Sequence, residues 1–387
     1  MIGRFPSAFL KGFGVFLWSF LIILPLHGDE TSSQTEILKK ISSTSIRQAL
    51  ESTQNIDEVA ARVGVSTSEL KRICLALKIS LPIPPEKPTP PSVSLPAKPP
   101  GSEMNTDAIL DYQEKSPYIL LVDKSDHKLY LLKYENNRPV IVEVFECKTG
   151  KNTGDKHERG DHRTPEGVYF FLEKYTHQQI VDHVGKENAY QYGELAFVTN
   201  FPNQIDRVRG KNGGGIWLHG TDEPFESTPS LDTRGCVVTT NETIKTLSPY
   251  IVLDRTPMIV VDKLNIVPRS EIESERNAVL SRIEQWRSAW SEKQINEYIM
   301  YYSPLFSSQG LNRDQWKVRK ADLAKINGTL RISFGNFSIL KQKDGMIVRF
   351  TQDYAADNVS NIGTKTLFLI QENANWEIVT EHFRKSN

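Results

Sequence analysis

The sequence predicts a multidomain protein with a β-rich domain at its centre, an α+β domain at its C-terminus and a small helical region near its N-terminus. Three observations support this fold class. The chain has 387 residues, enough for two or three domains. A proline-rich stretch over residues 80–105 separates two unlike parts. Short strand-like runs follow it, and long helical runs appear only after Pro268.

Composition excludes some classes of function. A hydrophobic content of 39% and a charged content of 24% are typical of a soluble globular protein. Lys+Arg and Asp+Glu balance at 47 each, so no overall positive charge points to nucleic acid as a partner. The three cysteines, Cys74, Cys147 and Cys236, are too few for a disulfide framework. Their odd number leaves a thiol unpaired, and Cys236 is the natural candidate.

Residues 1–28 have the pattern of an export signal. Arg4 and Lys11 precede an apolar run over residues 13–26, and polar residues begin at Asp29. Retention of this segment as a membrane anchor is the alternative. In both cases we expect the rest of the chain to work outside the cytoplasm, in the periplasm or cell envelope.

Residues 36–79 have a helical pattern. Residues 56–63 predict one short helix that ends at Gly64, and Ser66 is expected to cap a second, with Glu69 in the capping-box position. We interpret the region as a small helical hairpin for docking or dimerisation. A DNA-binding helix-turn-helix is disfavoured by export and by the lack of a basic recognition face. The proline-rich residues 80–105 that follow predict a semi-rigid spacer.

The β-rich domain is expected over residues 116–264, as a mainly antiparallel sheet or barrel-like structure. One short helix over residues 241–250 is expected, with Asn241 as its cap. The expected strands are Tyr118–Asp123, Lys128–Tyr134, Val140–Cys147, a run from Gly167, Glu194–Asn200, Gly215–His219, Cys236–Thr240 and Met258–Asp262.

The α+β domain is expected over residues 271–387. Residues 271–302 predict a helical segment rich in aromatic side chains, and a second helical stretch lies beyond Trp316. Trp286 and Trp290 are four residues apart on one helix face, which favours a role in the core. The expected strands are Arg331–Leu340, Gly345–Asp353, Lys365–Glu372 and Trp376–His382.

The stretch over residues 213–240 carries the strongest chemical signal. His219 follows a short apolar run and stands next to Gly220, while Cys236 follows Gly235 and precedes two valines. This pattern presents an imidazole and a thiol from neighbouring strand ends. A histidine in contact with a thiol raises its thiolate fraction and can later return the proton to a leaving amine. The glycine before the cysteine lets the backbone approach a substrate carbonyl, where N–H groups stabilise an oxyanion.

A metal site is the competing interpretation of the charged loop upstream. His157, Glu158, Asp161 and His162 have suitable side chains, but no HExxH or paired CxxC motif accompanies them. We therefore predict neither a metal nor a cofactor, and interpret the segment as a flexible, solvated loop that faces the substrate.

Three motifs resemble one known family. HGT at 219–221 and TRGCVV at 233–238 are similar to the signature of the L,D-transpeptidase (YkuD) family. TGKNTGDKHERGDHRTPEGVY at 149–169 resembles the substrate-side loop of that family. The resemblance covers roughly residues 118–262 and implies a β-rich catalytic domain that acts on peptidoglycan stem peptides.

The resemblance also implies roles for individual residues. Cys236 corresponds to the nucleophile, His219 to the base, and the Gly220 carbonyl to the group that orients the histidine. Further candidates for the oxyanion region or for substrate binding are Thr221, Thr233, Arg234 and Gly235. The chain departs from the family pattern at Val238, where members usually carry arginine. Another cation, of which Arg234 is the nearest in sequence, is expected to bind the substrate carboxylate, or the substrate end is held differently.

Two weaker resemblances concern the ends of the chain. AWSEKQINEYIMYYSPLF at 289–306 resembles the NTF2-like domain found in a cell-shape subgroup of L,D-carboxypeptidases, which use water as the acyl acceptor. AARVGVSTSELKRI at 60–73 resembles the helical centre of a LysM peptidoglycan-binding module, although the strand that opens such modules is missing before Ile56.

The function implied by the resemblance is that of a cysteine acyl transferase. It would form a thioester with a tetrapeptide stem, release D-Ala and pass the acyl group to an amine. Transfer to water, which trims tetrapeptides to tripeptides, is the first alternative. A non-catalytic wall-binding scaffold is the second, and retention of both His219 and Cys236 argues against it. The implied partners are stem peptides, with possible wall proteins bound through residues 36–79 or 271–387.

Overall fold

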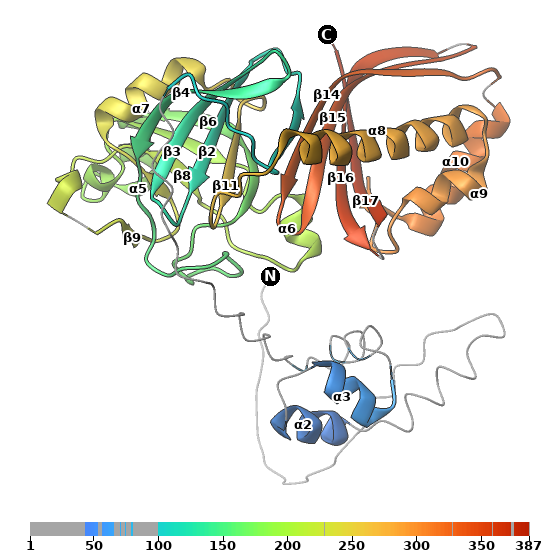
Figure 1. Cartoon of the computed structure of the whole chain (residues 1–387), viewed down its shortest axis with the longest axis horizontal. Helices are drawn as coiled ribbons and strands as arrows, with labels where there is room; N and C mark the ends of the chain where they lie inside the picture. The colour runs from blue at the N-terminus through green and yellow to red at the C-terminus, as the bar shows by residue number, and fades with distance from the viewer. Residues whose placement is uncertain are drawn as a thin grey trace, which may run out of the picture. The chain divides into compact units, whose positions relative to one another are not determined.

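The computed structural model describes two compact units of the chain, within residues 1–93 and 94–387 (Figure 1). The described residues are 43–52, 56–65, 70, 74, 79 and 100–386, without 228, 327, 358 and 373–374. The predicted export signal and most of the predicted proline-rich spacer therefore lie outside the described residues. No helix in the described part of the chain is both long and apolar enough to cross a membrane.

The N-terminal unit contains two described helices, α2 (Ser43–Ser52) and α3 (Ile56–Val63). The bounds of α3 are those predicted, and Gly64 ends it with a φ of 74°. Leu70 and Cys74 are helical and buried with residues of α2 and α3. The predicted cap of this later helix lies outside the described residues.

The central domain is built on an eight-stranded sheet with the order β10-β8-β7-β6-β11-β2-β3-β4. Its described neighbours run antiparallel, except for the parallel pairs β8–β10 and β2–β11. The mainly antiparallel sheet was predicted, and strand ends differ from the predicted ones by at most two residues. The strands are β2 (Tyr118–Asp123), β3 (Lys128–Glu135), β4 (Arg138–Glu146), β6 (Gly167–Thr176), β7 (Leu195–Thr199), β8 (Trp217–His219), β10 (Val237–Val238) and β11 (Pro257–Val261).

Short elements surround this sheet. The two-residue strand β5 (Thr149–Gly150) pairs in parallel with β9 (Leu231–Thr233). The helices are α5 (His177–Val184), α6 (Gln204–Val208) and α7 (Asn241–Leu247), with 3₁₀ turns at 189–191, 225–227 and 248–250.

The predicted cap of α7 was wrong by one residue. Thr240 has extended backbone geometry and is the cap, because its hydroxyl accepts a bond from the Thr243 N–H at 3.1 Å. Asn241 is instead the first helical residue. Its side chain accepts from the Glu194 N–H at 3.0 Å and donates to Asp222 at 2.7 Å. Asn241 thus ties the loop before β7 and the loop after β8 to α7.

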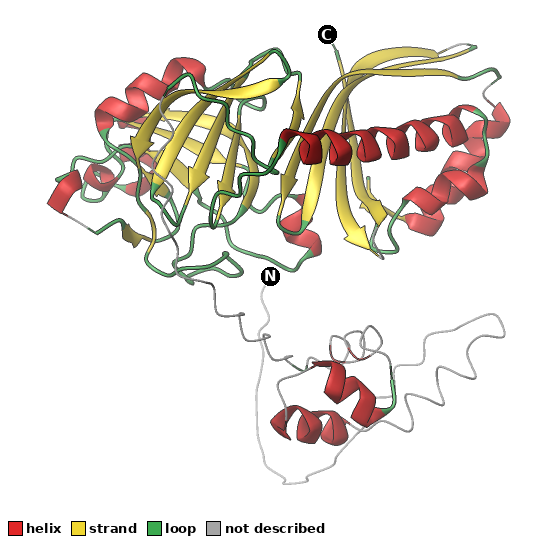
Figure 2. Ribbon diagram, in the orientation of Figure 1, coloured by secondary structure: helices red, strands yellow, loops and turns green. Residues whose placement is uncertain are grey.

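The C-terminal domain packs helices on a five-stranded antiparallel sheet with the order β1-β14-β15-β16-β17. Figure 2 shows α8 lying along one face of this sheet. The strands are β1 (Ile109–Tyr112), β14 (Arg331–Gln342), β15 (Gly345–Ala356), β16 (Val359–Glu372) and β17 (Asn375–Lys385), and Ser307–Ser308 (β12) pairs with Leu311–Asn312 (β13). The helices are α8 (Arg269–Ser291), α9 (Ile295–Tyr298) and α10 (Arg313–Ile326), with a 3₁₀ turn (η4) at 299–301.

The predicted helical segment over residues 271–302 is divided between α8 and α9. Lys293 has a φ of 60°, which a continuing right-handed helix does not allow. Trp286 and Trp290 belong to the hydrophobic core, as predicted, with ring centroids 5.4 Å apart.

The edge strand β1 was not predicted. It precedes the central domain in sequence, yet it pairs with β14 of the C-terminal sheet. Asp111 of β1 is 1% exposed and accepts bonds from Tyr134 of β3 at 3.2 Å and from Arg276 of α8 at 2.7 Å. One hydrophobic cluster also contains side chains of both sheets, such as Ile259 and Ile347. The two domains therefore share part of their core.

Removing the Asp111 carboxylate is expected to destabilise both domains together. Asp111→Ala removes the acceptor of the Tyr134 hydroxyl and of the partly exposed Arg276 guanidinium, and we expect a cost of about 2 kcal/mol. Urea denaturation would measure this loss as a single transition at lower urea concentration. Arg269→Ala, which removes a largely exposed pair with Glu273, is the control and should cost below about 0.5 kcal/mol. Equal losses of unfolding free energy in the two variants would contradict the prediction.

Candidate active site

The parallel pairing of β8 and β10 brings the predicted histidine and cysteine together. His219 is the register partner of Val238, and Leu218 is the partner of Val237. Because side chains alternate along a strand, Cys236, Val238 and His219 lie on one face of the sheet. His219 and Cys236 line the same cavity of about 370 Å³. The residues around it are Lys148, Lys151, Asn188, Gln191, Tyr192, His219, Thr221, Glu223, Asp232, Thr233, Arg234, Cys236 and Val238.

His219 is buried and oriented by the backbone. Its Nδ1 lies 2.6 Å from the Gly220 carbonyl oxygen. A carbonyl only accepts, so Nδ1 carries the proton and Nε2 carries the lone pair. Burial lowers the pKa of His219 to about 4, and the bond to Gly220 opposes this shift. The imidazole is therefore neutral at pH 7 and can act as a base.

Gly220 occupies a position that has no room for a side chain. A Cβ atom there would lie 2.3 Å from Oδ1 of Asn241. The backbone beside His219 is therefore closely packed against the start of α7. The Gly220 carbonyl thus orients the imidazole, and Asn241 packs against Gly220 itself. The ring centroid of Tyr192 lies 4.7 Å from that of His219.

Cys236 is partly exposed and neutral in the free protein. Its Sγ lies 3.5 Å from the Gly215 carbonyl oxygen, to which the thiol donates. Burial raises the pKa of Cys236 to about 11, while the Trp217 N–H and two nearby cations oppose the rise. A thiol with this pKa is protonated at pH 7, so a nucleophilic thiolate has to be formed by a base during reaction.

Thr233 and Gly235 build the turn that presents Cys236. The Thr233 hydroxyl donates to the Cys236 carbonyl at 2.7 Å and accepts from the Gly235 N–H at 3.0 Å. Gly235 has a φ of 126°, and a Cβ there would lie 2.7 Å from the Arg163 carbonyl oxygen. Only glycine fits this conformation and this contact. The Gly235 N–H is already bonded to Thr233, so its contribution to an oxyanion region is to shape the turn.

The two other predicted substrate-binding residues lie at the cavity wall. Arg234 is exposed and donates to Gln191 Oε1 at 3.2 Å. Thr221 is buried, and its hydroxyl accepts from the Glu223 N–H at 3.1 Å. Both line the cavity that contains His219 and Cys236.

Several cavity residues were missed from the sequence. Tyr192 and Gln191 come from the segment between α5 and β7, which has no motif to mark it. Lys148 directly precedes the TG pair of the upstream loop, and only its position in the sheet shows that it faces the cavity.

Comparison with known proteins identifies this arrangement. Residues 117–260 match the model of the L,D-transpeptidase catalytic domain (YkuD), and residues 278–382 match that of the Cds6 C-terminal NTF2-like domain. The structure of Bd1075 from Bdellovibrio bacteriovorus is 30% identical, with a TM-score of 0.64 and coverage of 73% of this chain and 98% of Bd1075. The chain belongs to the L,D-transpeptidase (YkuD) family.

A further solved structure supports the two-domain fold. Pgp2 of Campylobacter jejuni, described as a helical cell shape determining protein, is 24% identical with a TM-score of 0.58. The similarity covers 72% of this chain and 96% of Pgp2. No curated protein is similar enough in sequence to match the chain. The predicted family and the predicted combination with an NTF2-like domain are thus confirmed, and the family implies a location in the cell envelope.

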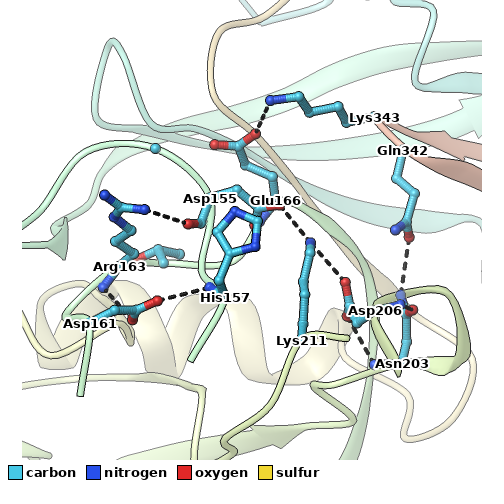
Figure 3. A network of polar contacts seen from close by, with 12 residues as sticks. Asp155, His157, Asp161, Arg163, Glu166, Asn203, Asp206, Lys211, Gln342 and Lys343 are labelled. Atoms are coloured by element: carbon cyan, nitrogen blue, oxygen red, sulfur yellow. Dashed lines mark hydrogen bonds and ion pairs between the residues drawn. The ribbon is translucent and has the colours of Figure 1, made fainter. Parts of the chain in front are cut away.

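The charged loop of the L,D-transpeptidase domain is anchored by buried ion pairs (Figure 3). Lys211 Nζ lies 2.6 Å from Asp155 and 3.0 Å from Asp206, and all three side chains are buried. Lys124 pairs with Glu166 at 2.9 Å, again with both side chains buried. Asp155 and Glu166 of the loop are therefore buried and paired, whereas His157 and Glu158, which were predicted to be solvated, are exposed.

Asp161 was a candidate metal ligand in the sequence, but its carboxylate is hydrogen-bonded within the loop itself. Its carboxylate accepts from the backbone N–H groups of His157, Glu158 and Arg163 and from Lys156 Nζ. Burial opposes these bonds, but together they lower the pKa of Asp161 to about 2. Within the described ranges, no group of three or more His, Cys, Asp or Glu side chains is placed to hold a metal ion.

The NTF2-like domain touches the base of this loop. Gln342, at the β14–β15 turn, accepts from the Val168 N–H at 3.2 Å and from Asn203 Nδ2 at 3.0 Å. The next residue, Lys343, has its Nζ 4.0 Å from Glu166 (Figure 3). The position of the substrate-side loop therefore depends on contacts from both domains.

The NTF2-like domain has a cavity of its own, of about 380 Å³. Glu381, which lines it, accepts from Lys365 at 3.0 Å and from Tyr302 at 2.8 Å. Lys320 Nζ lies 4.2 Å from the Trp290 ring centroid, and burial lowers the pKa of Lys320 to about 8. Charged side chains therefore lie among aromatic rings at this cavity.

The pH dependence of Cys236 alkylation tests the neutral resting state. With a thiol pKa of about 11, the thiolate fraction rises about tenfold for each pH unit between 7 and 9.5. The rate of carbamidomethylation by iodoacetamide should rise in the same proportion, because His219 is already neutral above about pH 4. Mass spectrometry of the Cys236 peptide separates this reaction from that of buried Cys74 and Cys147. A rate that levels off below pH 8 would instead reveal a thiolate–imidazolium pair.

Proposed function

We propose that the chain is a peptidoglycan cysteine acyl transferase that forms a thioester between Cys236 and a tetrapeptide stem and releases D-Ala. The observation that carries this proposal is the placement of a thiol and an imidazole with a free Nε2 in one cavity. Gly220 fixes the imidazole in the tautomer that a general base needs. The family to which the chain belongs gives the class of substrate.

The first half of the reaction acylates the cysteine. The thiol turns from the Gly215 carbonyl toward His219, and its proton passes to Nε2 as Sγ attacks the carbonyl carbon at the L-centre of meso-diaminopimelate. The C–S bond forms and the negative charge moves to the carbonyl oxygen. The C–N bond to D-Ala then breaks, and the imidazolium gives its proton to the leaving amine.

The second half returns the enzyme to its resting state. The acceptor gives a proton to His219 and attacks the thioester carbon, the C–S bond breaks, and the Cys236 thiolate takes the proton back. With water as acceptor the product is a tripeptide, and one water is consumed for each D-Ala released. With an amine the product is a cross-link.

We propose water as the acceptor, in place of the amine expected from the sequence. The combination of an L,D-transpeptidase domain with an NTF2-like domain supports this proposal, because it resembles the cell-shape subgroup of L,D-carboxypeptidases, which use water. The similarity to Pgp2, a helical cell shape determining protein, agrees with a trimming reaction that changes cell shape.

The remaining parts of the chain are proposed to bring the enzyme to its substrate. Residues 1–28 direct export or anchor the chain. Residues 80–105 separate the helical hairpin from the catalytic domain over 116–264, and the domain over 271–387 binds wall components.

A wall-binding scaffold without catalysis is the competing proposal. Incubation with a carbapenem distinguishes the two proposals, because a nucleophilic Cys236 is expected to form an adduct. Failure of Cys236 to form an adduct would favour the scaffold.

Incubation with purified tetrapeptide muropeptides tests the reaction directly. Mass spectrometry is expected to show tripeptide and free D-Ala, which would identify a carboxypeptidase. Cross-linked dimers would identify a transpeptidase. Cys236→Ala should abolish both products, because no other group can form the thioester. Product formation by Cys236→Ala would contradict the proposal.

Gly220→Ala tests the positioning of the imidazole. The added Cβ would lie 2.3 Å from Asn241 Oδ1, so the backbone that orients His219 has to shift. Displacement of a catalytic group by about 1 Å costs about 100-fold in rate, and we expect that loss in kcat/KM for D-Ala release. Gly214→Ala is the matched control, since a Cβ there meets no heavy atom within 4 Å. Activity of Gly220→Ala within threefold of the control would show that this contact does not position His219.

A further inference from the structure

Val238 leaves the cavity without the cation that family members usually carry two residues after the cysteine. Its side chain is buried and apolar, and it lines the cavity beside His219. A substrate carboxylate in this cavity needs a positive partner, because an unpaired charge in a buried site is costly. The structure places another cation next to this position.

Lys148 is the cross-strand neighbour of Val238. The Lys148 N–H donates to the Val238 carbonyl at 2.7 Å, and the Val238 N–H donates to the Lys148 carbonyl at 3.0 Å. Residues that exchange both bonds in an antiparallel pair project their side chains on the same face. Since Val238 also pairs with His219, the three residues form a row across the sheet. Lys148 lies two strand spacings, about 10 Å, from His219.

The surroundings of Lys148 suit a desolvated cation. The residue is 6% exposed, and its Nζ lies 4.4 Å from the Phe225 ring centroid. Burial lowers the pKa of Lys148, and the carboxylates of Asp232, Glu223 and Glu226 oppose that shift. Asp232 and Glu223 line the same cavity and are the anions with which a substrate carboxylate competes. An ammonium in this environment binds a carboxylate more strongly than one in water.

Two other cations line the cavity among the described residues, but both are solvated. The side chain of Lys151 is 54% exposed and lies 3.6 Å from Asp232. Arg234, which the sequence suggested as the replacement, is exposed and donates to Gln191. Ion pairs of exposed side chains contribute little to binding. Lys148 is therefore the better candidate.

The geometry of the proposed reaction points to one carboxylate. His219 has to return a proton to the leaving amine, so the nitrogen of the leaving residue lies beside the imidazole. The carboxylate of that residue is one carbon away from this nitrogen. A lysine in the same row as His219 can reach it along the sheet face, whereas the acyl part of the substrate lies at Cys236.

We propose that Lys148 binds the C-terminal carboxylate of the leaving residue and so restricts the enzyme to stems that end one residue beyond the cleaved bond. This inference rests on the proposed function. It makes Lys148 a specificity-determining residue, and a tetrapeptide is preferred over a stem extended by another residue.

Peptide binding to Cys236→Ala protein tests this proposal without turnover. Calorimetry would measure the affinities of the free tetrapeptide and of its C-terminal amide. Both peptides are tested on the Cys236→Ala protein and on the same protein with Lys148→Met added. Loss of one charge-assisted contact is expected to weaken binding of the free acid about 10- to 100-fold, and to leave binding of the amide unchanged. Lys148→Arg should retain most of the affinity for the acid. Lys133→Met, which removes a surface lysine of β3, is the control for general charge effects.

Four results would overturn the proposal. The first is equal weakening of acid and amide by Lys148→Met, which would indicate a structural role. The second is unchanged affinity of that variant for the acid. The third is equal affinity of the Cys236→Ala protein for acid and amide, a comparison that needs no Lys148 variant to fold. The fourth is a loss of affinity when the carboxyl of diaminopimelate is amidated instead of the terminal carboxyl. Absence of D-Ala release by the unsubstituted protein would contradict the proposed function separately.

Discussion

The parallel register of β8 and β10 is the constraint on which the site depends. These strands are only three and two residues long, yet their pairing decides which side chains face the cavity. A slip of one residue would turn Cys236 to the opposite face of the sheet, where the core is apolar. The turn built by Thr233 and Gly235 and the helix that begins at Asn241 fix the chain on both sides of β10, so this register is held by contacts outside the strands.

The electrostatic state of the site follows from that placement. Burial keeps both the imidazole and the thiol neutral in the free protein. A resting thiol is less prone to oxidation than a thiolate, which suits a protein that works in the cell envelope. In the proposed reaction, charge would develop only as the sulfur attacks the peptide carbonyl.

Local patterns predicted much of the fold, whereas contacts between distant residues were missed. The strand over Tyr118–Asp123 is a continuous apolar run, the helix over Ile56–Val63 has a helical pattern that ends at glycine, and both are present as expected. The edge strand β1 has only four residues, and its partner lies in the last domain of the chain. The buried anchor of the charged loop was missed because the sequence does not show that Lys211 pairs with Asp155.

In the candidate site, too, local features were predicted and long-range contacts were missed. His219 and Cys236 were predicted from their motifs, because glycine neighbours and flanking apolar runs are local features. Lys148 was not, because its role depends on a cross-strand partner far along the chain. Arg234 was favoured as the cation for its nearness in sequence, although the structure leaves it exposed. Nearness along the chain is a poor guide wherever a sheet brings distant strands together.

The pairing of β1 with β14 has a consequence for the order of folding. During synthesis β1 emerges before the L,D-transpeptidase domain, but its partner emerges only after that domain is complete. An unpaired edge strand is a template for wrong association, and the chain carries it until the last domain arrives. The native pairing of β1 therefore becomes possible only once Arg331–Gln342 (β14) has been made, even when the catalytic sheet is already in place.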